Sequence, residues 1–163
     1  MRRLLVVFTL LALVGTACGS AGPPTTSVCT APTDEALDPS SGLHVLRPDE
    51  VVFDDLTPTS GPHLPAGGPL GLREPLPPAQ QVAVLERGSV LLSVDSTESA
   101  LLDNAVAGFA ADAVIHPVEG LGDPLVVTAW RSRIVCSTMD ADYVRWFVDN
   151  RTGQFAAEPH QAG

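Results

Sequence analysis

The second half of the chain consists of short apolar runs separated by turn residues. Runs rich in valine and leucine are typical of strands with a buried face. They predict strands at residues 82–85, 89–94 and 113–116, the last ended by Pro117, and a hairpin of residues 125–130 and 133–136 around Arg131 and Ser132. The order of these runs indicates that the second half of the chain forms one sheet.

Two helical patterns lie between and after the predicted strands. Ser96 is a candidate N-cap for a helix with a single apolar face, formed by Leu101, Leu102, Ala105, Val106 and Phe109. Residues 140–150 form a second amphipathic helix with Tyr143 and Phe147 facing inward. We therefore predict an α+β fold, a small mixed sheet with two helices packed on one face.

The N-terminal pattern predicts export. Arg2 and Arg3 precede an apolar run over residues 4–14, which is too short to span a bilayer, and small residues lead to Cys18. Residues 1–17 are the predicted signal peptide, and the ending resembles the lipobox of bacterial lipoproteins, although Gly15 stands where leucine is usual. We expect lipid on Cys18 and a position on the outer face of the cell membrane; the alternative is a secreted protein with a stray cysteine.

Proline- and glycine-rich stretches divide the remainder. Residues 18–41 predict a flexible linker, residues 42–160 a single domain, and residues 161–163 a short tail. Inside the domain, residues 57–78 predict a long Pro/Gly-rich loop that crosses the fold in an extended form.

Composition narrows the chemistry. Nine cationic residues face nineteen acidic ones, which gives a formal net charge of −10 and excludes nucleic acid as a partner. Outside the cytoplasm, Cys29 and Cys136 are expected to form a disulfide. No nucleophile elbow, phosphate loop or dinucleotide fingerprint is present.

Three segments carry a family resemblance: Thr-Ser-Gly-Pro-His at 59–63, Leu-Glu-Arg-Gly at 85–88 and Val-Thr-Ala-Trp at 127–130. With Ala-Glu-Pro at 157–159, they resemble an uncharacterised family of bacterial membrane-anchored or secreted domains of unknown function. The resemblance extends from about His44 to Pro159. In that family a Pro-Pro-Thr-Ser-Gly-Pro-His segment precedes a His-Asn-x-Glu-His-Gly-like segment.

The resemblance implies a cluster of three imidazoles and a carboxylate, a set suited to zinc or copper. The corresponding positions in this chain are His63, Ala83, Glu86 and Arg87, so two imidazoles are missing. We expect Arg87 to take the place of a cation by pairing with Glu86 or another acid, which leaves the pocket without a metal. His44, His116 and His160 are interpreted as structural residues.

These observations lead to a first hypothesis of a non-catalytic, lipid-anchored domain without a cofactor. It would bind an unknown envelope protein or a small ligand through His63, Glu86 and Arg87. The alternative is a metal-binding protein or metalloenzyme with a rearranged site of His63, Glu86 and either His44 or His116. A third possibility is a structural surface lipoprotein. Converging imidazoles would favour the metal site.

Overall fold

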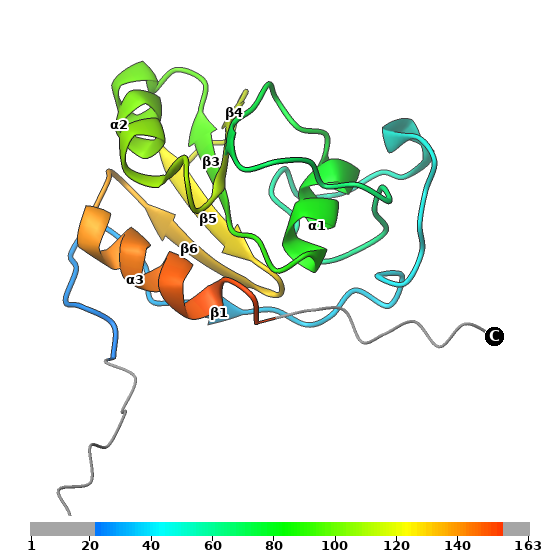
Figure 1. The fold of residues 1–163 in the computed structure, drawn as a ribbon, viewed down its shortest axis with the longest axis horizontal. Helices are drawn as coiled ribbons and strands as arrows, with labels where there is room; N and C mark the ends of the chain where they lie inside the picture. The colour runs from blue at the N-terminus through cyan, green and yellow to red at the C-terminus, as the bar shows by residue number, and fades with distance from the viewer. Residues whose placement is uncertain (1–21, 155–163) are drawn as a thin grey trace, which may run out of the picture.

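A mixed sheet forms the centre of the computed structural model, which describes residues 22–154 (Figure 1). Within these residues six strands pair in the order β1-β6-β5-β3-β4-β2. The strands are β1 (Thr33–Asp34), β2 (Gly71–Leu72), β3 (Leu91–Asp95), β4 (Val114–Val118), β5 (Leu125–Ala129) and β6 (Ser132–Cys136). The α-helices are α1 (Pro78–Glu86), α2 (Ser99–Phe109) and α3 (Ala141–Arg151), and residues Pro48–Glu50 form the 3-10 helix η1.

The central strand β3 has neighbours of both orientations. It pairs in parallel with β4, the next strand along the chain, and α2 makes the crossover between them. On its other side β3 pairs antiparallel with β5, which forms a tight hairpin with β6. Arg131 takes a positive φ of 58° in the turn of that hairpin. The predicted hairpin and α+β class are confirmed.

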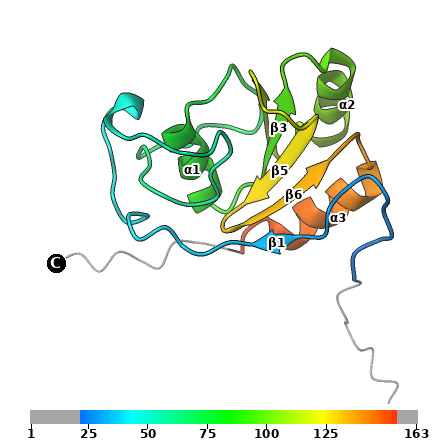
Figure 2. The ribbon, with the colours of Figure 1, turned by 180° about the vertical axis from the view of Figure 1, so that it is seen from behind.

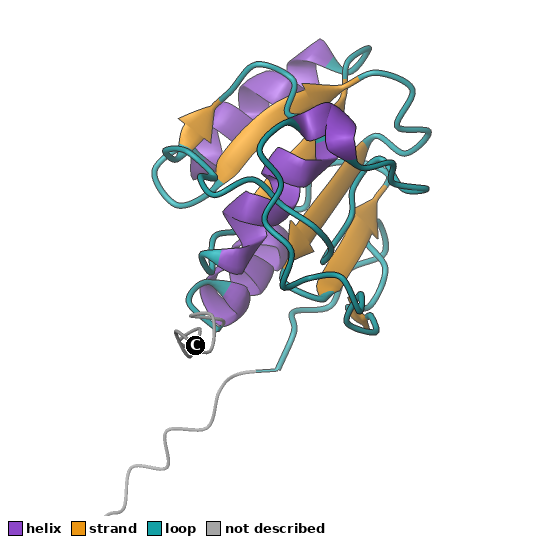
Figure 3. Cartoon of the chain, turned by 90° about the vertical axis from the view of Figure 1, so that its right-hand side faces the viewer, coloured by secondary structure: helices purple, strands orange, loops and turns teal. Residues whose placement is uncertain are grey.

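The two faces of the sheet carry different layers (Figure 3). Alternate side chains of β3 and β4, including Leu92 and Ile115, pack with α2 and α3 in the larger core. Their neighbours Leu91 and Val114 face the opposite side, against Val84 and Leu85 of α1. Two helices therefore share one face, as predicted, and a third helix covers the other.

That third helix corrects the sequence prediction, which placed a strand at residues 82–85. Pro78 suits the first turn of a helix because its missing N–H needs no partner there. Gly88, with φ 77°, follows the last turn. The helix has no one-sided apolar pattern because the Pro/Gly-rich loop covers its outer side. The loop passes so close that a Cβ on Gly67 would lie 2.7 Å from the backbone of Val84.

Two boundaries also differ from expectation. Helix α2 begins at Ser99 and not after Ser96, because the carboxylate of Asp95 accepts hydrogen bonds from Thr97 and forms a separate turn. Strand β4 continues through Pro117, which pairs with Val94. The predicted helix at residues 140–150 is confirmed, with Asp140 as its N-cap.

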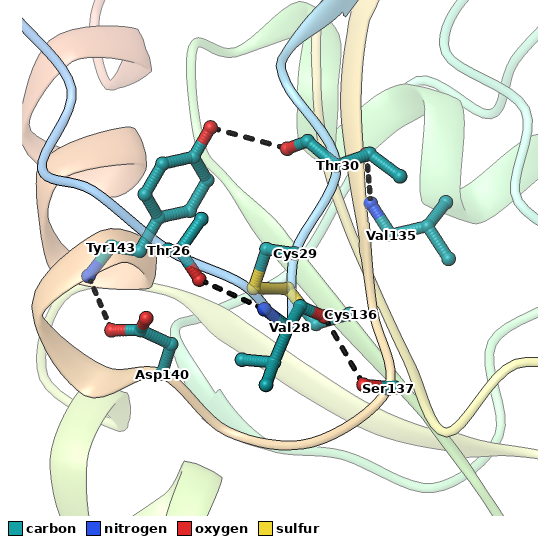
Figure 4. The surroundings of a disulfide bond; sticks show 9 residues. All are labelled: Thr26, Val28, Cys29, Thr30, Val135, Cys136, Ser137, Asp140 and Tyr143. Carbon is teal, nitrogen blue, oxygen red and sulfur yellow. Dashed lines mark hydrogen bonds between the residues drawn. A yellow bond between two sulfur atoms is a disulfide. The ribbon is translucent and has the colours of Figure 1, made fainter.

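The N-terminal strap, residues 28–44, starts along the edge of the sheet beside β6 and continues past β1 towards the side of α1 (Figure 2). Cys29 and Cys136 form the expected disulfide, and β1 pairs antiparallel with β6. Around the disulfide, Thr30 exchanges hydrogen bonds with Val135, and its carbonyl accepts one from the Tyr143 hydroxyl at 3.1 Å (Figure 4). Much of the predicted linker of residues 18–41 is thus part of the fold.

The predicted signal peptide, the lipidated Cys18 and the tail at 161–163 lie outside the described residues. No helix among residues 22–154 has both the length and the apolar character needed to cross a membrane.

Candidate functional site

His63 lies at the end of the Thr-Ser-Gly-Pro-His segment and is fully buried. The N-terminal strap holds its backbone, because His63 N–H donates to the Leu43 carbonyl at 3.0 Å and its own carbonyl accepts from Val45 N–H at 2.9 Å. These bonds make an isolated parallel bridge between His44 and His63. Two histidines that are distant in the sequence are therefore paired by the backbone.

Gly61 is required for the turn before His63. Its φ of 138° is a backbone conformation that residues with a Cβ rarely adopt. A Cβ at this position would also lie 2.9 Å from the ring of Phe53. Gly61 is thus a geometric requirement of the turn that leads to the buried imidazole.

Glu86 is the last residue of α1, and its carboxylate is directed at the buried imidazole. The Oε2 atom lies 2.7 Å from His63 Nε2, and the Glu86 side chain retains 19% exposure. Helix α1 therefore brings a partly exposed carboxylate to a fully buried ring nitrogen.

The other ring nitrogen defines the tautomer of His63. Nδ1 lies 3.1 Å from the Gly61 carbonyl, which can only accept, so Nδ1 carries the hydrogen. In the neutral ring, Nε2 then presents a lone pair towards the carboxylate of Glu86. Nε2 is buried and makes no hydrogen bond of acceptable geometry within residues 22–154.

His44 completes the cluster from the exposed side. Its ring meets that of His63 edge-on, with centroids 4.7 Å apart. One ligand atom from each of His44, His63 and Glu86 lies within 4.8 Å of the other two. Neighbouring ligand atoms of a tetrahedral zinc ion lie about 3.4 Å apart, so the exposed His44 ring has to turn towards the other two ligands to close the set.

Arg87 takes no part in this cluster. It is exposed, caps the C-terminus of α1, and donates from Nη2 to the Pro65 carbonyl at 3.1 Å. The expected pairing of Arg87 with Glu86 is not among the ion pairs of residues 22–154. Ala83 is buried one turn earlier in the same helix.

His116 belongs to a different environment. Its Nδ1 accepts from Leu76 N–H at 3.2 Å, which places its hydrogen on Nε2, 2.9 Å from the Ser93 hydroxyl. This tautomer cannot take a proton from the serine through Nε2, so the pair is structural and not a nucleophile with its base. Burial lowers the pKa of His116 to about 4.

The segment that carries His63 is fastened to the N-terminal strap by side-chain bonds. Thr59 donates to the Glu35 carboxylate at 2.6 Å, and Asp38 N–H donates to the Ser60 hydroxyl at 3.0 Å. The carbonyl of Thr59 also accepts from Arg131 N–H at 3.0 Å. The threonine and serine of the motif therefore attach the loop to both the strap and the sheet.

Arg133 joins the same parts by charge. It lies on β6 and forms ion pairs with Glu35 and with Asp55, the latter at 2.6 Å. Burial raises the pKa of Asp55, but the Thr57 N–H and the Arg133 guanidinium outweigh it and hold that pKa below its ordinary value. The carboxylate therefore remains charged where the loop begins.

Sequence reasoning identified His63 and Glu86 but assigned His44 to the surface and kept it only as one alternative ligand. No local pattern marks His44, because its neighbours carry no motif and the pairing with His63 depends on backbone bonds across the fold. His44 and His63 are nineteen positions apart, and no sequence pattern at that distance indicates that their backbones pair.

The fold and the cluster define an α+β domain with two histidines and a glutamate gathered where a loop meets a helix end. The chain belongs to a family of proteins of unknown function, DUF3105, whose family model matches residues 44–162. It has no match among the curated proteins or the solved structures. Membership confirms the resemblance to a family of unknown function. It does not indicate a function, so the chemistry of the site has to be inferred from its geometry.

Proposed function

We propose that this protein is a lipid-anchored extracytoplasmic domain that binds a divalent transition-metal ion through His44, His63 and Glu86. The observation that carries the proposal is the buried Nε2 of His63, which faces a carboxylate without a hydrogen bond. A lone pair and a carboxylate oxygen repel each other at short range. A cation between them removes that repulsion, and it completes the coordination of both atoms.

The donor set favours zinc or copper among the common metals. Imidazole nitrogen suits these ions, whereas magnesium and calcium prefer oxygen ligands. Two histidines and one glutamate are also a recurrent zinc set that leaves a fourth position open. The bond from Nδ1 of His63 to the Gly61 carbonyl matches the outer partner that metal-bound histidines use to fix their ring.

The surroundings of the cluster support reversible binding. His63 is buried, while Glu86 is partly exposed and His44 is exposed, so an ion reaches the site from solvent without unfolding the loop. The N-terminal strap carries His44, and the disulfide ties the start of that strap to β6. We propose that the site is assembled only in an oxidising compartment, which agrees with the export signal.

Zinc titration of the purified mature chain against a chelating indicator tests the metal site. The isosteric variant Glu86→Gln should lower the affinity by roughly a hundredfold, at or above the effect of losing an outer-shell partner. His44→Ala, an exposed change, should do the same without loss of folding. Arg87→Ala is the matched control, because Arg87 is the neighbour of Glu86 but lies outside the cluster.

Two results would contradict the metal site. One is failure of the wild-type chain to bind zinc or copper at micromolar concentration. The other is equal affinity in wild type and Glu86→Gln, since a site built on this carboxylate cannot tolerate the amide.

The anchor is tested separately. A Cys18→Ala variant expressed in a bacterial host should appear in the soluble extracytoplasmic fraction, whereas the wild-type chain should sediment with membranes. Membrane association that persists in Cys18→Ala would overturn the lipid anchor and leave the metal site unaffected.

A further inference from the structure

A groove of about 820 Å³ opens beside the cluster, between two loop segments. Its lining includes residues 35–40 of the N-terminal strap, residues 50–55, which start at the last residue of η1, and residues 58–60. Leu43 and Pro62 also line the groove, and each is the sequence neighbour of a histidine of the cluster. The groove is therefore separate from the metal site but adjoins it.

Residues 51–53 line the groove with apolar side chains, and Val51 begins this segment in an extended backbone. Val51 has φ −132° and ψ 147°, as in a strand. Val52 is 95% exposed, and residues 51–53 make no backbone hydrogen bond to any residue in 22–154. An extended segment with open N–H and C=O groups is a template for another strand.

Two leucines elsewhere in the lining of the groove are also exposed. Leu37 is 48% exposed and Leu43 is 60% exposed. Exposed leucines and a valine that border one groove form an apolar patch, and such patches mark binding sites more often than isolated residues do.

The charge of the groove is strongly negative. Five of its lining residues are acidic: Glu35, Asp38, Glu50, Asp54 and Asp55. Arg133 is the cationic residue among the lining residues and pairs with Glu35 and Asp55, and Arg47 outside the lining pairs with Glu50, so Asp38 and Asp54 are the lining acids without an ion pair among the described residues. An occupant therefore needs positive charge as well as apolar side chains. A second copy of this chain fits poorly, since each copy has a net charge of −10.

We propose that this groove binds an extended peptide segment of a partner protein in which basic and apolar side chains alternate. The segment adds as a strand to residues 51–53, so that main-chain bonds provide affinity. Its apolar side chains contact Leu37, Leu43 and Val52, and its basic side chains face the carboxylates at the rim. Alternation follows from the strand geometry, because successive side chains point to opposite sides.

The test uses a short synthetic peptide of alternating lysine and valine, with fluorescence anisotropy as the readout. The wild-type chain should bind it, and added salt should weaken binding because exposed charges are screened. A peptide with glutamate in place of lysine should not bind. Equal binding of the two peptides would overturn the proposal, as would no binding of the lysine peptide at millimolar concentration.

The Val52→Pro variant tests strand addition directly. Proline removes the N–H that would pair with the peptide, and the strand-like Val51 is compatible with a following proline. Since Val52 is exposed and its N–H is unbonded within the described residues, folding should be retained, as circular dichroism would show. Binding should weaken by about tenfold or more, which corresponds to at least about 1.4 kcal/mol.

Leu46→Ala is the control, because Leu46 is 83% exposed on the other side of η1 in the chain and does not line the groove. It should bind the lysine peptide like the wild type. Unchanged binding by Val52→Pro would overturn strand addition. A wild-type dimer that Val52→Pro converts to a monomer in light scattering would also overturn the proposal, because the occupant would then be a second copy.

Discussion

The two halves of this domain are stabilised in different ways. Residues 89–151 form most of the sheet and pack α2 and α3 on one face in a continuous apolar core. Residues 28–86 contain little sheet, and many of their buried side chains are polar. Every large hydrophobic residue that is exposed within the described chain lies in this first half: Leu37, Leu43, Leu46, Val52, Leu56, Leu70 and Leu72.

The difference shows which interactions stabilise each half. The second half buries enough apolar surface to fold around its own core. The first half is held to it by the apolar packing of α1 on the sheet and by discrete attachments, namely the disulfide, the pairing of β1 with β6 and of β2 with β4, and the ion pairs of Arg133. Both proposed binding sites lie on the attached half, as expected where loops on a rigid scaffold carry function.

The largest effect is expected in the core half. Phe147 is fully buried between α3 and the sheet, so Phe147→Ala should lower the free energy of unfolding by about 3–5 kcal/mol. Urea unfolding would measure it, with exposed Asp149→Ala of the same helix as the control. A loss below 1 kcal/mol, by the same scale, would show that the core is not the scaffold.

Removing the disulfide should have the next largest effect and should reach both halves. Cys29→Ala with Cys136→Ala should cost about 2–4 kcal/mol, because the cross-link encloses most of the domain. Zinc affinity should also fall, since the released strap carries His44. If unfolding changes but zinc affinity does not, the strap does not position His44.

The buried imidazole of His116 should make the core half sensitive to acid. Its pKa of about 4 in the folded chain lies below the ordinary value of 6.5, so the unfolded chain binds the proton first. Stability is therefore complete above about pH 6.5 and decreases as the pH falls towards 4, by about 2–3 kcal/mol near pH 4.5. Urea midpoints of wild type and His116→Gln should converge over this range, and parallel curves would contradict the assignment.

The smallest effect is expected at the attachment of the loop half. Arg133→Met should cost about 1–2 kcal/mol, because its partners Glu35 and Asp55 are partly exposed and solvent screens the pairs. Amide hydrogen exchange should increase at residues 57–60 while remaining low in β5. Exchange that rises equally in both places would show that the two halves unfold as one unit.

The elements that could be predicted are those with local signals. The hairpin of β5 and β6, helix α3 and strand β3 each have their own apolar pattern and turn residues, so their prediction holds. The prediction of helix α1 was wrong because the helix is buried on several sides. Its sequence therefore lacks the one-sided apolar periodicity on which a helix prediction depends. Strands β1 and β2 have two residues each and exist only through their partners.

The sequence alone determined the α+β class, led to the expectation of a disulfide between Cys29 and Cys136, and through the family resemblance directed attention to His63 and Glu86. These conclusions rest on patterns and residue types that are local in the chain. Only the tertiary structure decided that His44 joins His63, that Arg87 does not join Glu86, and that residues 51–53 border a groove. The physical reason is that contacts between distant residues depend on backbone bonds and loop paths that no local pattern encodes.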